Sequence, residues 1–245
     1  MATAWLLLLE ATELVAGADD TLLRSLAQHL GAAEQARLSG IVRPRRRREF
    51  ILGRLLLRHG VARVSTCAVE RIEVSERAGA GPQVTVPASH GEPIQASLSH
   101  GGGWIACAIG VGFALGIDIE ADDAGRDLRA LAQTALSEQE RRWVDAQGEC
   151  ANAFYQLWCG KESFYKYRCN AGLQAEARLP PLRCDDAGAP PSAAGAALIL
   201  DDSTPGLHLA MCCPVDTELI TEKIRMEDLM KRFTQSNKSS RIRVR

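Results

Sequence analysis

The chain contains 245 residues, of which 46% are hydrophobic and 24% charged, and its formal net charge is −1. This composition is too apolar for a disordered chain and too evenly charged for a general polyanion-binding protein. The longest apolar run, near residues 4–9, is much shorter than the roughly 20 residues of a membrane-spanning helix. It also lacks the features of a signal peptide. We therefore expect a soluble, cytoplasmic protein with no membrane contact.

Cysteine usage agrees with that compartment. Eight cysteines are present, without a Cys-x-x-Cys pair and without a nearby histidine at zinc-ligand spacing. Several lie in apolar surroundings, such as residues 105–109, where cysteine behaves as a small hydrophobe. We expect reduced, structural thiols, because a chain of this length does not depend on disulfides.

The N-terminal half predicts a strand over 4–10 and then two helices. Leucines at helical spacing indicate a helix over 21–35, and a proline opens a second helix over 44–58 with an apolar stripe. Residues 78–93 are rich in Gly, Pro and Ala and predict a loop with at most one short strand. The apolar segment 96–111, with three central glycines, predicts a strand, a tight turn and a second strand.

The C-terminal half has these predicted elements in chain order: a strand over 113–120, helices over 126–147 and 150–168, and strands over 196–200 and 207–212. Helical character returns near Glu222 and gives way to a basic tail that we expect to be mobile. Helices packed on small, mostly antiparallel sheets make the expected fold class α+β.

The first candidate site is a pair of carboxylates in the segment 116–120, Gly-Ile-Asp-Ile-Glu. Alternate side chains of a strand share a face, so Asp118 and Glu120 point one way while the two isoleucines point into the core. Adjacent carboxylates repel one another unless a cation or proton intervenes, and an oxygen-only pair favours Mg²⁺. The alternative is a strand end with acidic residues on its solvated side, and this short motif alone favours that alternative.

The second candidate site lies in the helix predicted over 150–168. Trp158, Glu162 and Lys166 are four residues apart and therefore share one helix face. An amphipathic helix with an ordinary Glu–Lys pair is the simpler structural explanation. Trp158 makes this face semi-buried rather than solvated, and Lys161 and Glu162 stand as adjacent charges between aromatic residues. These features favour a functional face.

A third group, Ser99 and His100 followed by three glycines, suits the close approach of a phosphate. Small residues let backbone amides approach a ligand, and serine and histidine side chains donate to phosphate oxygens. A bare turn between strands has the same sequence features. The arginine run at 45–48 resembles a nucleic-acid patch, but a charge run on an amphipathic helix is usually a solvated face. Because the whole chain is not basic, we expect no nucleic-acid partner.

Together these motifs resemble the 4′-phosphopantetheinyl transferase superfamily, in its larger type that activates peptide and polyketide synthases (the surfactin-synthetase-activating type). The signatures of that family read Gly-Ile-Asp-x-Glu and Trp-x-x-Lys-Glu-Ser/Ala-x-x-Lys. This chain has them at 116–120 and 158–166, after Ser99 and His100 and in the family's order. The resemblance covers about residues 4–215.

The resemblance implies a fold of two similar α/β subdomains in one chain, which pack as a pseudo-dimer around one active site. The implied divisions are an N-terminal half with coenzyme A phosphate contacts, a C-terminal half with the metal and catalytic motifs, and a basic tail: 1–112, 113–220 and 221–245. A monomer is expected, because both halves belong to one chain.

The implied activity is that of a holo-[acyl-carrier-protein] synthase. Such an enzyme transfers the 4′-phosphopantetheine arm of coenzyme A to a serine of an acyl or peptidyl carrier protein and releases adenosine 3′,5′-bisphosphate, with Mg²⁺ as cofactor. By resemblance, Asp118, Glu120 and Glu162 hold the Mg²⁺. Glu162 is also the candidate for accepting the serine proton, and Lys166 stabilises the pyrophosphate or the leaving bisphosphate.

The resemblance assigns four further side chains to the coenzyme A phosphates: Arg37, Arg54, Ser99 and His100. The family often has Gly-Lys-Pro before the Ser-His strand, with the lysine on a coenzyme phosphate. This chain has Ala-Gly-Pro at 80–82, so that contact is missing, or Arg77 replaces it. The carrier protein is expected to meet the exposed surface of 121–155, although no residue there identifies the carrier or its pathway.

Two other classes remain open from the sequence. A metal-dependent hydrolase with the same carboxylates would cleave the coenzyme A pyrophosphate without a carrier. A non-catalytic module would bind coenzyme A or a carrier through a degraded site. The intact set of acidic residues with Lys166 argues against the second alternative.

Overall fold

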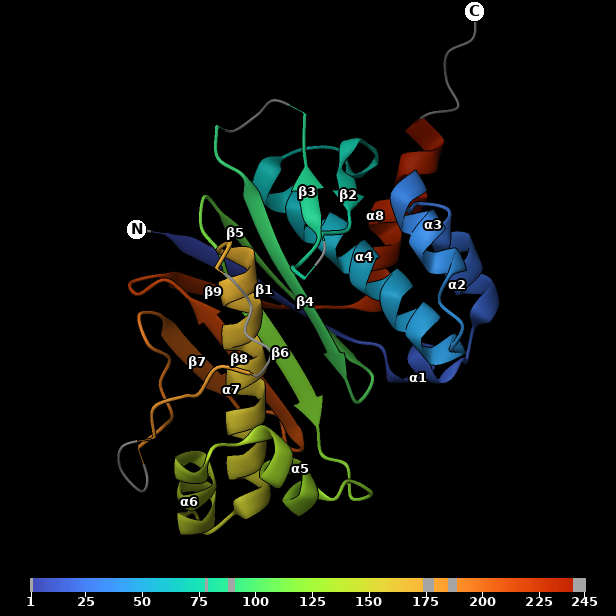
Figure 1. Cartoon of the computed structure of the whole chain (residues 1–245). Helices are drawn as coiled ribbons and strands as arrows, with labels where there is room; N and C mark the ends of the chain where they lie inside the picture. The colour runs from blue at the N-terminus through green and yellow to red at the C-terminus, as the bar shows by residue number, and fades with distance from the viewer. Residues whose placement is uncertain (1, 78, 88–90, 174–178, 185–188, 240–245) are drawn as a thin grey trace, which may run out of the picture.

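Two β-sheets form the centre of the molecule, and the longer helices cover their outer faces (Figure 1). The computed structural model describes residues 2–77, 79–87, 91–173, 179–184 and 189–239. It confirms the α+β class. No helix in the described part of the chain is both long and apolar enough to cross a membrane. All eight cysteines lie in these ranges, and each is a free thiol.

The N-terminal sheet has four strands in the order β4-β5-β1-β9. Their bounds are Ile94–Gly101 for β4, Trp104–Val111 for β5, Thr3–Glu10 for β1 and Glu218–Ile224 for β9. Side chains of β1 alternate: Leu7 belongs to the core under helix α4 (Pro44–Ser65), and Leu6 belongs to the core between the two sheets. Both faces of β1 are therefore buried.

The C-terminal sheet has three strands in the order β6-β8-β7. Their bounds are Gly116–Ala121 for β6, Leu207–Cys213 for β8 and Ala197–Asp201 for β7. Helix α7 (Cys150–Asn170) covers the outer face of this sheet. Apart from β9, the two sheets share one arrangement, because each has a first strand that pairs with the second strand of a later hairpin.

The shorter elements complete the chain. They are α1 (Thr12–Ala16), α2 (Asp20–Ala27), α3 (Ala32–Ser39), a 3₁₀ turn at Val69–Arg71, β2 (Glu73–Ser75), β3 (Gln83–Thr85), α5 (Leu128–Ala135) and α6 (Glu138–Ala146). The single helices predicted over 21–35 and 126–147 are each two helices. The first breaks before Gly31, whose N–H donates to Glu34 of the new helix. The second breaks at Ser137, which forms a reciprocal capping box with Glu140.

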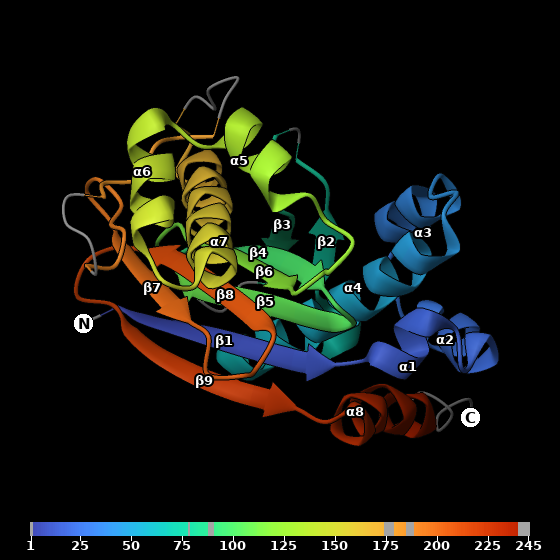
Figure 2. The same cartoon turned by 90° about the horizontal axis from the view of Figure 1, so that it is seen from below.

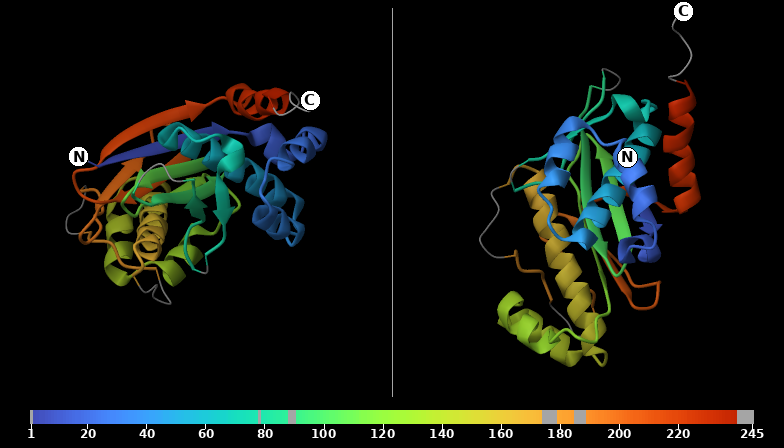
Figure 3. Two further views of the ribbon diagram at one scale, coloured as in Figure 1. Left: turned by 90° about the horizontal axis from the view of Figure 1, so that it is seen from above. Right: turned by 90° about the vertical axis from the view of Figure 1, so that its right-hand side faces the viewer.

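The helical character predicted after Glu222 is confirmed, whereas the tail predicted after residue 220 is wrong for most of that segment. Strand β9 pairs in parallel with β1, and helix α8 (Met226–Ser239) lies beside the N-terminal helices (Figures 2 and 3). Leu229 and Phe233 of α8 are fully buried in the core under α4. Burial of these apolar side chains stabilises the segment. Residues 240–245 lie outside the described residues.

The two sheets meet where β4 runs beside β6. Ser97 Oγ accepts a hydrogen bond from the N–H of Ile117 at 3.1 Å, and Ser99 Oγ accepts from the N–H of Ile119 at 3.3 Å. Helix α7 approaches β6 very closely, since a Cβ added to Gly116 would lie 2.0 Å from the carbonyl oxygen of Ser163. These contacts bring β4, β6 and α7 together at one seam.

Candidate active site

Asp118 and Lys166 meet at this seam. Strand alternation directs Asp118 of β6 toward α7, and Lys166 of α7 places its Nζ 2.7 Å from Oδ1 of Asp118. The same ammonium donates to the carbonyl of Ile117 at 3.0 Å, and Ser99 Oγ donates to Oδ1 of Asp118 at 2.7 Å. Three sequence-predicted residues from three elements therefore form one hydrogen-bonded group.

The other oxygen of Asp118 is unusual. Oδ2 is buried and has no hydrogen-bond partner among the described residues. A buried carboxylate oxygen without a partner is costly, so its place in a native fold calls for an explanation such as a bound ion.

Glu120 and Glu162 face the same region from β6 and α7. Burial raises the pKa of Glu120, Asp118 raises it further, and Arg126, whose Nη1 lies 3.0 Å from Oε2 of Glu120, opposes both effects. Burial also raises the pKa of Glu162; Lys166 opposes this, and Asp118 and Glu120 add to it. The three carboxylates are thus close enough to repel one another.

These carboxylates suit a hard cation. In the described part of the chain, no three His, Cys, Asp or Glu side chains are placed to hold one metal ion as they stand. However, the unpartnered Oδ2 of Asp118 and the mutual repulsion of the three carboxylates are both relieved by a cation. An all-oxygen donor set is the one that Mg²⁺ prefers. The residue types and the unpartnered Oδ2 of Asp118 therefore fit Mg²⁺.

A cavity of about 490 Å³ opens beside this group, between α4 and β4. It brings together all four predicted phosphate-binding residues and two further arginines: Arg37, Arg43, Arg46, Arg54, Ser99 and His100. We call it the arginine cavity. Since guanidinium groups bind phosphate as planar, multidentate donors, such a cavity suits a ligand with several phosphates.

Arg54 is the most buried cation of the arginine cavity, with a side chain only 7% exposed. It forms an ion pair with Glu76 and lies over the ring of Phe50, 4.9 Å from the centroid. Its Nε and Nη1 are buried without a hydrogen-bond acceptor among the described residues. Two unused donors on a buried guanidinium are available to an anion.

Sequence reasoning missed part of this cavity. The arginine run at 45–48 is a solvated face in part, since Arg45 and Arg46 are exposed. However, Arg46 also contacts His100, Arg47 donates to the carbonyls of Leu38 and Ile41, and Arg48 pairs with Asp20. The sequence did contain a signal of these separate contacts, because successive residues of a helix such as α4 point in different directions and therefore meet different neighbours. Two acidic members, Glu49 and Glu76, had no distinguishing signal.

Arg77 does not take the place of the missing lysine. Its Nε donates to the carbonyl of Gly81 at 2.9 Å, and Nη2 donates to Oδ1 of Asn170 at 2.9 Å. A Cβ at Gly81 would lie 2.6 Å from the carbonyl oxygen of Ala96, so no side chain fits there without movement. Arg77 therefore fastens this segment to α7.

The adjacent residues Lys161 and Glu162 have different surroundings. Lys161 is 2% exposed, and its Nζ lies 2.8 and 2.7 Å from the two carboxylate oxygens of Glu140 on α6. Glu140 also accepts the N–H of Leu182. Burial raises the pKa of Glu140, but the hydrogen bonds from Lys161 and Leu182 outweigh this effect and lower it. Lys161 thus fastens α6 and the segment at Leu182 to α7, while Glu162 faces Asp118 and Glu120.

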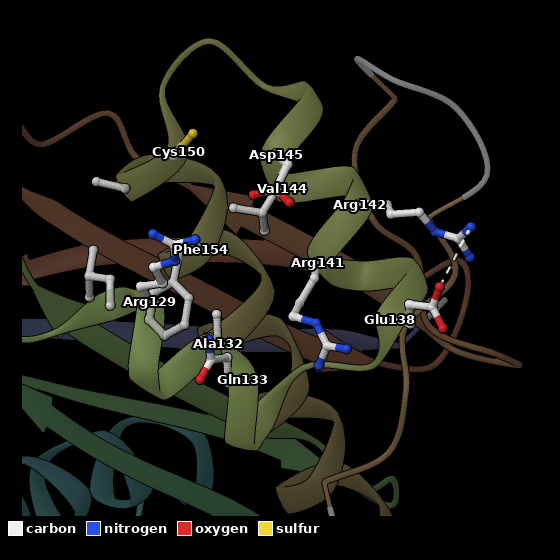
Figure 4. Close-up of a pocket in the computed structure, with 12 residues that line it drawn as sticks. Arg129, Ala132, Gln133, Glu138, Arg141, Arg142, Val144, Asp145, Cys150 and Phe154 are labelled. Carbon is white, nitrogen blue, oxygen red and sulfur yellow. Dashed lines mark ion pairs between the residues drawn. The ribbon is translucent and has the colours of Figure 1, made fainter.

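A second cavity, of about 590 Å³, lies between α5, α6 and the start of α7 (Figure 4). We call it the α5–α6 groove. Leu128, Val144 and Phe154 give it an apolar floor, and Arg129 and Arg142 are exposed at its edge. It falls within the surface 121–155 that the sequence predicted for partner contact.

Comparison with known proteins supports a candidate active site in the C-terminal half of the chain. Residues 114–204 match the sequence model of the 4′-phosphopantetheinyl transferase superfamily, and they include Asp118, Glu120, Glu162 and Lys166. A Haemophilus influenzae protein named "Putative 4′-phosphopantetheinyl transferase" is 34% identical over 79 residues, which cover 31% of this chain and 33% of that protein. The chain thus spans about a third of the length of the relative that it matches. Both similarities support the superfamily, and a transferase of this kind, for this part of the chain.

Proposed function

We propose that this protein transfers the 4′-phosphopantetheine arm of coenzyme A to a serine of an acyl or peptidyl carrier protein. The single observation that carries the proposal is the group formed by Asp118, Lys166 and Ser99 directly beside the arginine cavity. A pyrophosphate bound in that cavity would lie against a set of carboxylates suited to Mg²⁺. Transfer of a phosphorus-containing group requires such positioning and charge neutralisation more than it requires a protein nucleophile.

The reaction balances without any further reactant. The serine oxygen forms a bond to the phosphorus that carries the pantetheine, and the bond from that phosphorus to the bridging oxygen breaks. The bridging oxygen leaves with adenosine 3′,5′-bisphosphate, and Glu162 accepts the serine proton. Lys166 stabilises negative charge on the reacting phosphate oxygens. Mg²⁺, held by Asp118, Glu120 and Glu162, would supply further charge neutralisation when bound.

The arginine cavity would hold the coenzyme. Its volume of about 490 Å³ lies within the range of small-molecule sites. Arg54, with two unused donors, and Arg37 would bind the 3′-phosphate, and Ser99 and His100 would contact the pyrophosphate. The shared strand arrangement of the two sheets supports a pseudo-dimer of two similar halves, and a monomer suffices because one chain supplies both sides of the site.

The α5–α6 groove is the proposed docking surface for the carrier. Its apolar floor fits the apolar face of a helix, and the exposed Arg129 and Arg142 favour acidic residues beside that face. Phe154 of the groove stacks on Trp158, with the ring centroids 6.1 Å apart, and both belong to the helix that carries Glu162. A carrier seated there would lie about 12 Å along α7 from Glu162, since each helical residue rises 1.5 Å.

The experiment that distinguishes the candidate functions measures the product released from the coenzyme rather than the change in the carrier. Chromatography of a reaction with coenzyme A, Mg²⁺ and an apo carrier should show adenosine 3′,5′-bisphosphate accumulating only while the carrier is present. Equal release without a carrier would indicate a coenzyme A pyrophosphate hydrolase instead. Coenzyme binding without any release would indicate a non-catalytic module.

A further inference from the structure

Glu49 is a buried acid in a cavity otherwise suited to a polyanion. Its side chain is 6% exposed, and it lines the arginine cavity together with Arg46 and His100. A carboxylate in this place repels phosphates, so its charge alone weakens the binding of a coenzyme. Its position therefore needs a compensating role.

The contacts of Glu49 suggest that role. One carboxylate oxygen lies 3.0 Å from Nε of Arg45, and the other lies 3.5 Å from Nη1 of Arg46 and 3.3 Å from Nδ1 of His100. Glu49 thus links α4 to the histidine at the end of β4.

The same contacts determine which ring nitrogen of His100 carries the proton. Nη1 of Arg46 contacts Nε2 of His100 more closely than Nδ1, from which it lies 3.4 Å, and because a guanidinium can only donate, we assign Nε2 as the acceptor. The neutral ring would then carry its proton on Nδ1, which lies 3.3 Å from Oε2 of Glu49. A carboxylate that receives one imidazole N–H fixes the ring and stabilises the imidazolium formed when the other nitrogen gains a proton.

We propose that Glu49 is a positioning residue, which orients His100 so that protonated Nε2 donates to a phosphate oxygen of the bound coenzyme. Arg46, now beside Nε2, turns to the same phosphate when the coenzyme enters. The inference rests on the proposed function, because it assumes a phosphate-bearing coenzyme in this cavity. It explains why an acidic side chain is found among these arginines.

The surroundings of His100 lower its pKa overall, and Glu49 opposes that effect. Burial lowers the pKa of His100, Glu49 of α4 raises it, and Arg46 of α4 and Lys166 of α7 lower it, with a smaller raising effect from Asp118 of β6. Glu49 is therefore the largest influence that favours the imidazolium. Its removal leaves His100 neutral over a wider pH range.

The test compares two acids of one cavity by titration calorimetry with coenzyme A. Glu76→Gln is the matched control, because Glu76 lines the same cavity but pairs with Arg54 and not with His100. If charge alone mattered, both neutral variants would bind coenzyme A more tightly. The proposal predicts that Glu49→Gln binds about tenfold more weakly at about pH 8, which corresponds to one lost charge-assisted hydrogen bond. It also predicts that the deficit shrinks as the pH is lowered, because a falling pH protonates the imidazole without the carboxylate.

Two further measurements keep the proposal falsifiable. In a His100→Ala background, Glu49→Gln should no longer weaken binding. Nitrogen-15 spectra of the histidines in the wild-type protein should show the proton of His100 on Nδ1, which needs no variant to fold. Tighter binding by Glu49→Gln, an unchanged deficit without His100, or a proton on Nε2 would each overturn the proposal. Failure of the wild-type protein to bind coenzyme A would instead overturn the proposed function.

Discussion

Nζ of Lys166 lies 2.7 Å from Oδ1 of Asp118, while Oδ2 of the same carboxylate has no hydrogen-bond partner among the described residues. The lysine neutralises one side of Asp118 and leaves the other side available to a cation. Because Lys166 comes from α7 and Asp118 from β6, this pair also fixes α7 against the sheet. The close packing at Gly116 serves the same contact.

Asp118→Asn should reduce turnover by about a hundredfold or more, because the variant loses the charge that holds Mg²⁺. Asp123→Asn is the control, since Asp123 is exposed in the loop after β6, where its side chain lies 3.7 Å from Arg126 and accepts the N–H of Gly125 at 2.9 Å. Paramagnetic resonance of added Mn²⁺ should show binding by the wild-type and control proteins and much weaker binding by Asp118→Asn. Equal Mn²⁺ affinity in all three would remove Asp118 from the metal site.

Glu162→Gln should lower kcat by about 10²–10⁴-fold, the usual contribution of a general base, and leave the melting temperature nearly unchanged. The substitution keeps the shape of the side chain, and Glu162 is only half-buried on its helix. Steady-state kinetics together with thermal unfolding would show the separation. Full turnover in a folded Glu162→Gln protein would mean that another group accepts the serine proton.

Lys161→Met should lower the stability of the protein, in contrast to Glu162→Gln, although the two residues are adjacent. It leaves Glu140 buried and unpaired, which should lower the free energy of unfolding by about 3–5 kcal/mol. Denaturant unfolding measures this loss. The control is Glu138→Gln, which removes the exposed ion pair of Glu138 with Arg142 and should cost less than about 1 kcal/mol. A stable but inactive Lys161→Met protein would assign Lys161 to the chemistry instead.

Gly116→Ala should destabilise the protein by about 3 kcal/mol or more, because the new Cβ would lie 2.0 Å from the carbonyl oxygen of Ser163. Separation of α7 from β6 also moves Lys166 away from Asp118, so activity should fall with stability. Gly148→Ala is the control, since a Cβ there meets nothing within 4 Å. Equal unfolding midpoints for the two variants would contradict the close packing at this seam.

The double variant Arg129→Glu with Arg142→Glu should raise KM for the carrier by about tenfold and leave KM for coenzyme A unchanged. Both arginines are exposed at the α5–α6 groove, and reversal of their charges turns attraction of an acidic helix into repulsion. Arg24→Glu, on the exposed surface of α2, is the control. Unchanged carrier KM in the double variant would move the docking surface elsewhere.

The set of Asp118, Glu120, Glu162 and Lys166 was predictable from sequence because each pair of these residues lies within one strand or one helix. Alternation in a strand places Asp118 and Glu120 on one face, and helical spacing does the same for Glu162 and Lys166. Resemblance to a family then joined the two motifs, in which Trp158 follows Asp118 by 40 positions. The meeting of Asp118 with Lys166 agrees with that prediction.

Other features depend on contacts that local patterns do not contain. Strand β9 pairs with β1 from the far end of the chain, and its sequence, Glu-Leu-Ile-Thr-Glu-Lys-Ile, shows too little apolar alternation to reveal the pairing. The break at Ser137 was readable in principle, since Ser137 and Glu140 have the spacing of a capping box. Glu49 offered no such signal, because its role arises from His100 on another element.

The most direct test of the central claim is intact-mass spectrometry of an apo carrier protein after incubation with this protein, coenzyme A and Mg²⁺. The account predicts that the carrier gains the mass of one phosphopantetheine arm, and that EDTA abolishes the gain until Mg²⁺ is restored. A carrier of unchanged mass, across both acyl and peptidyl carriers and with coenzyme A consumed, would contradict it.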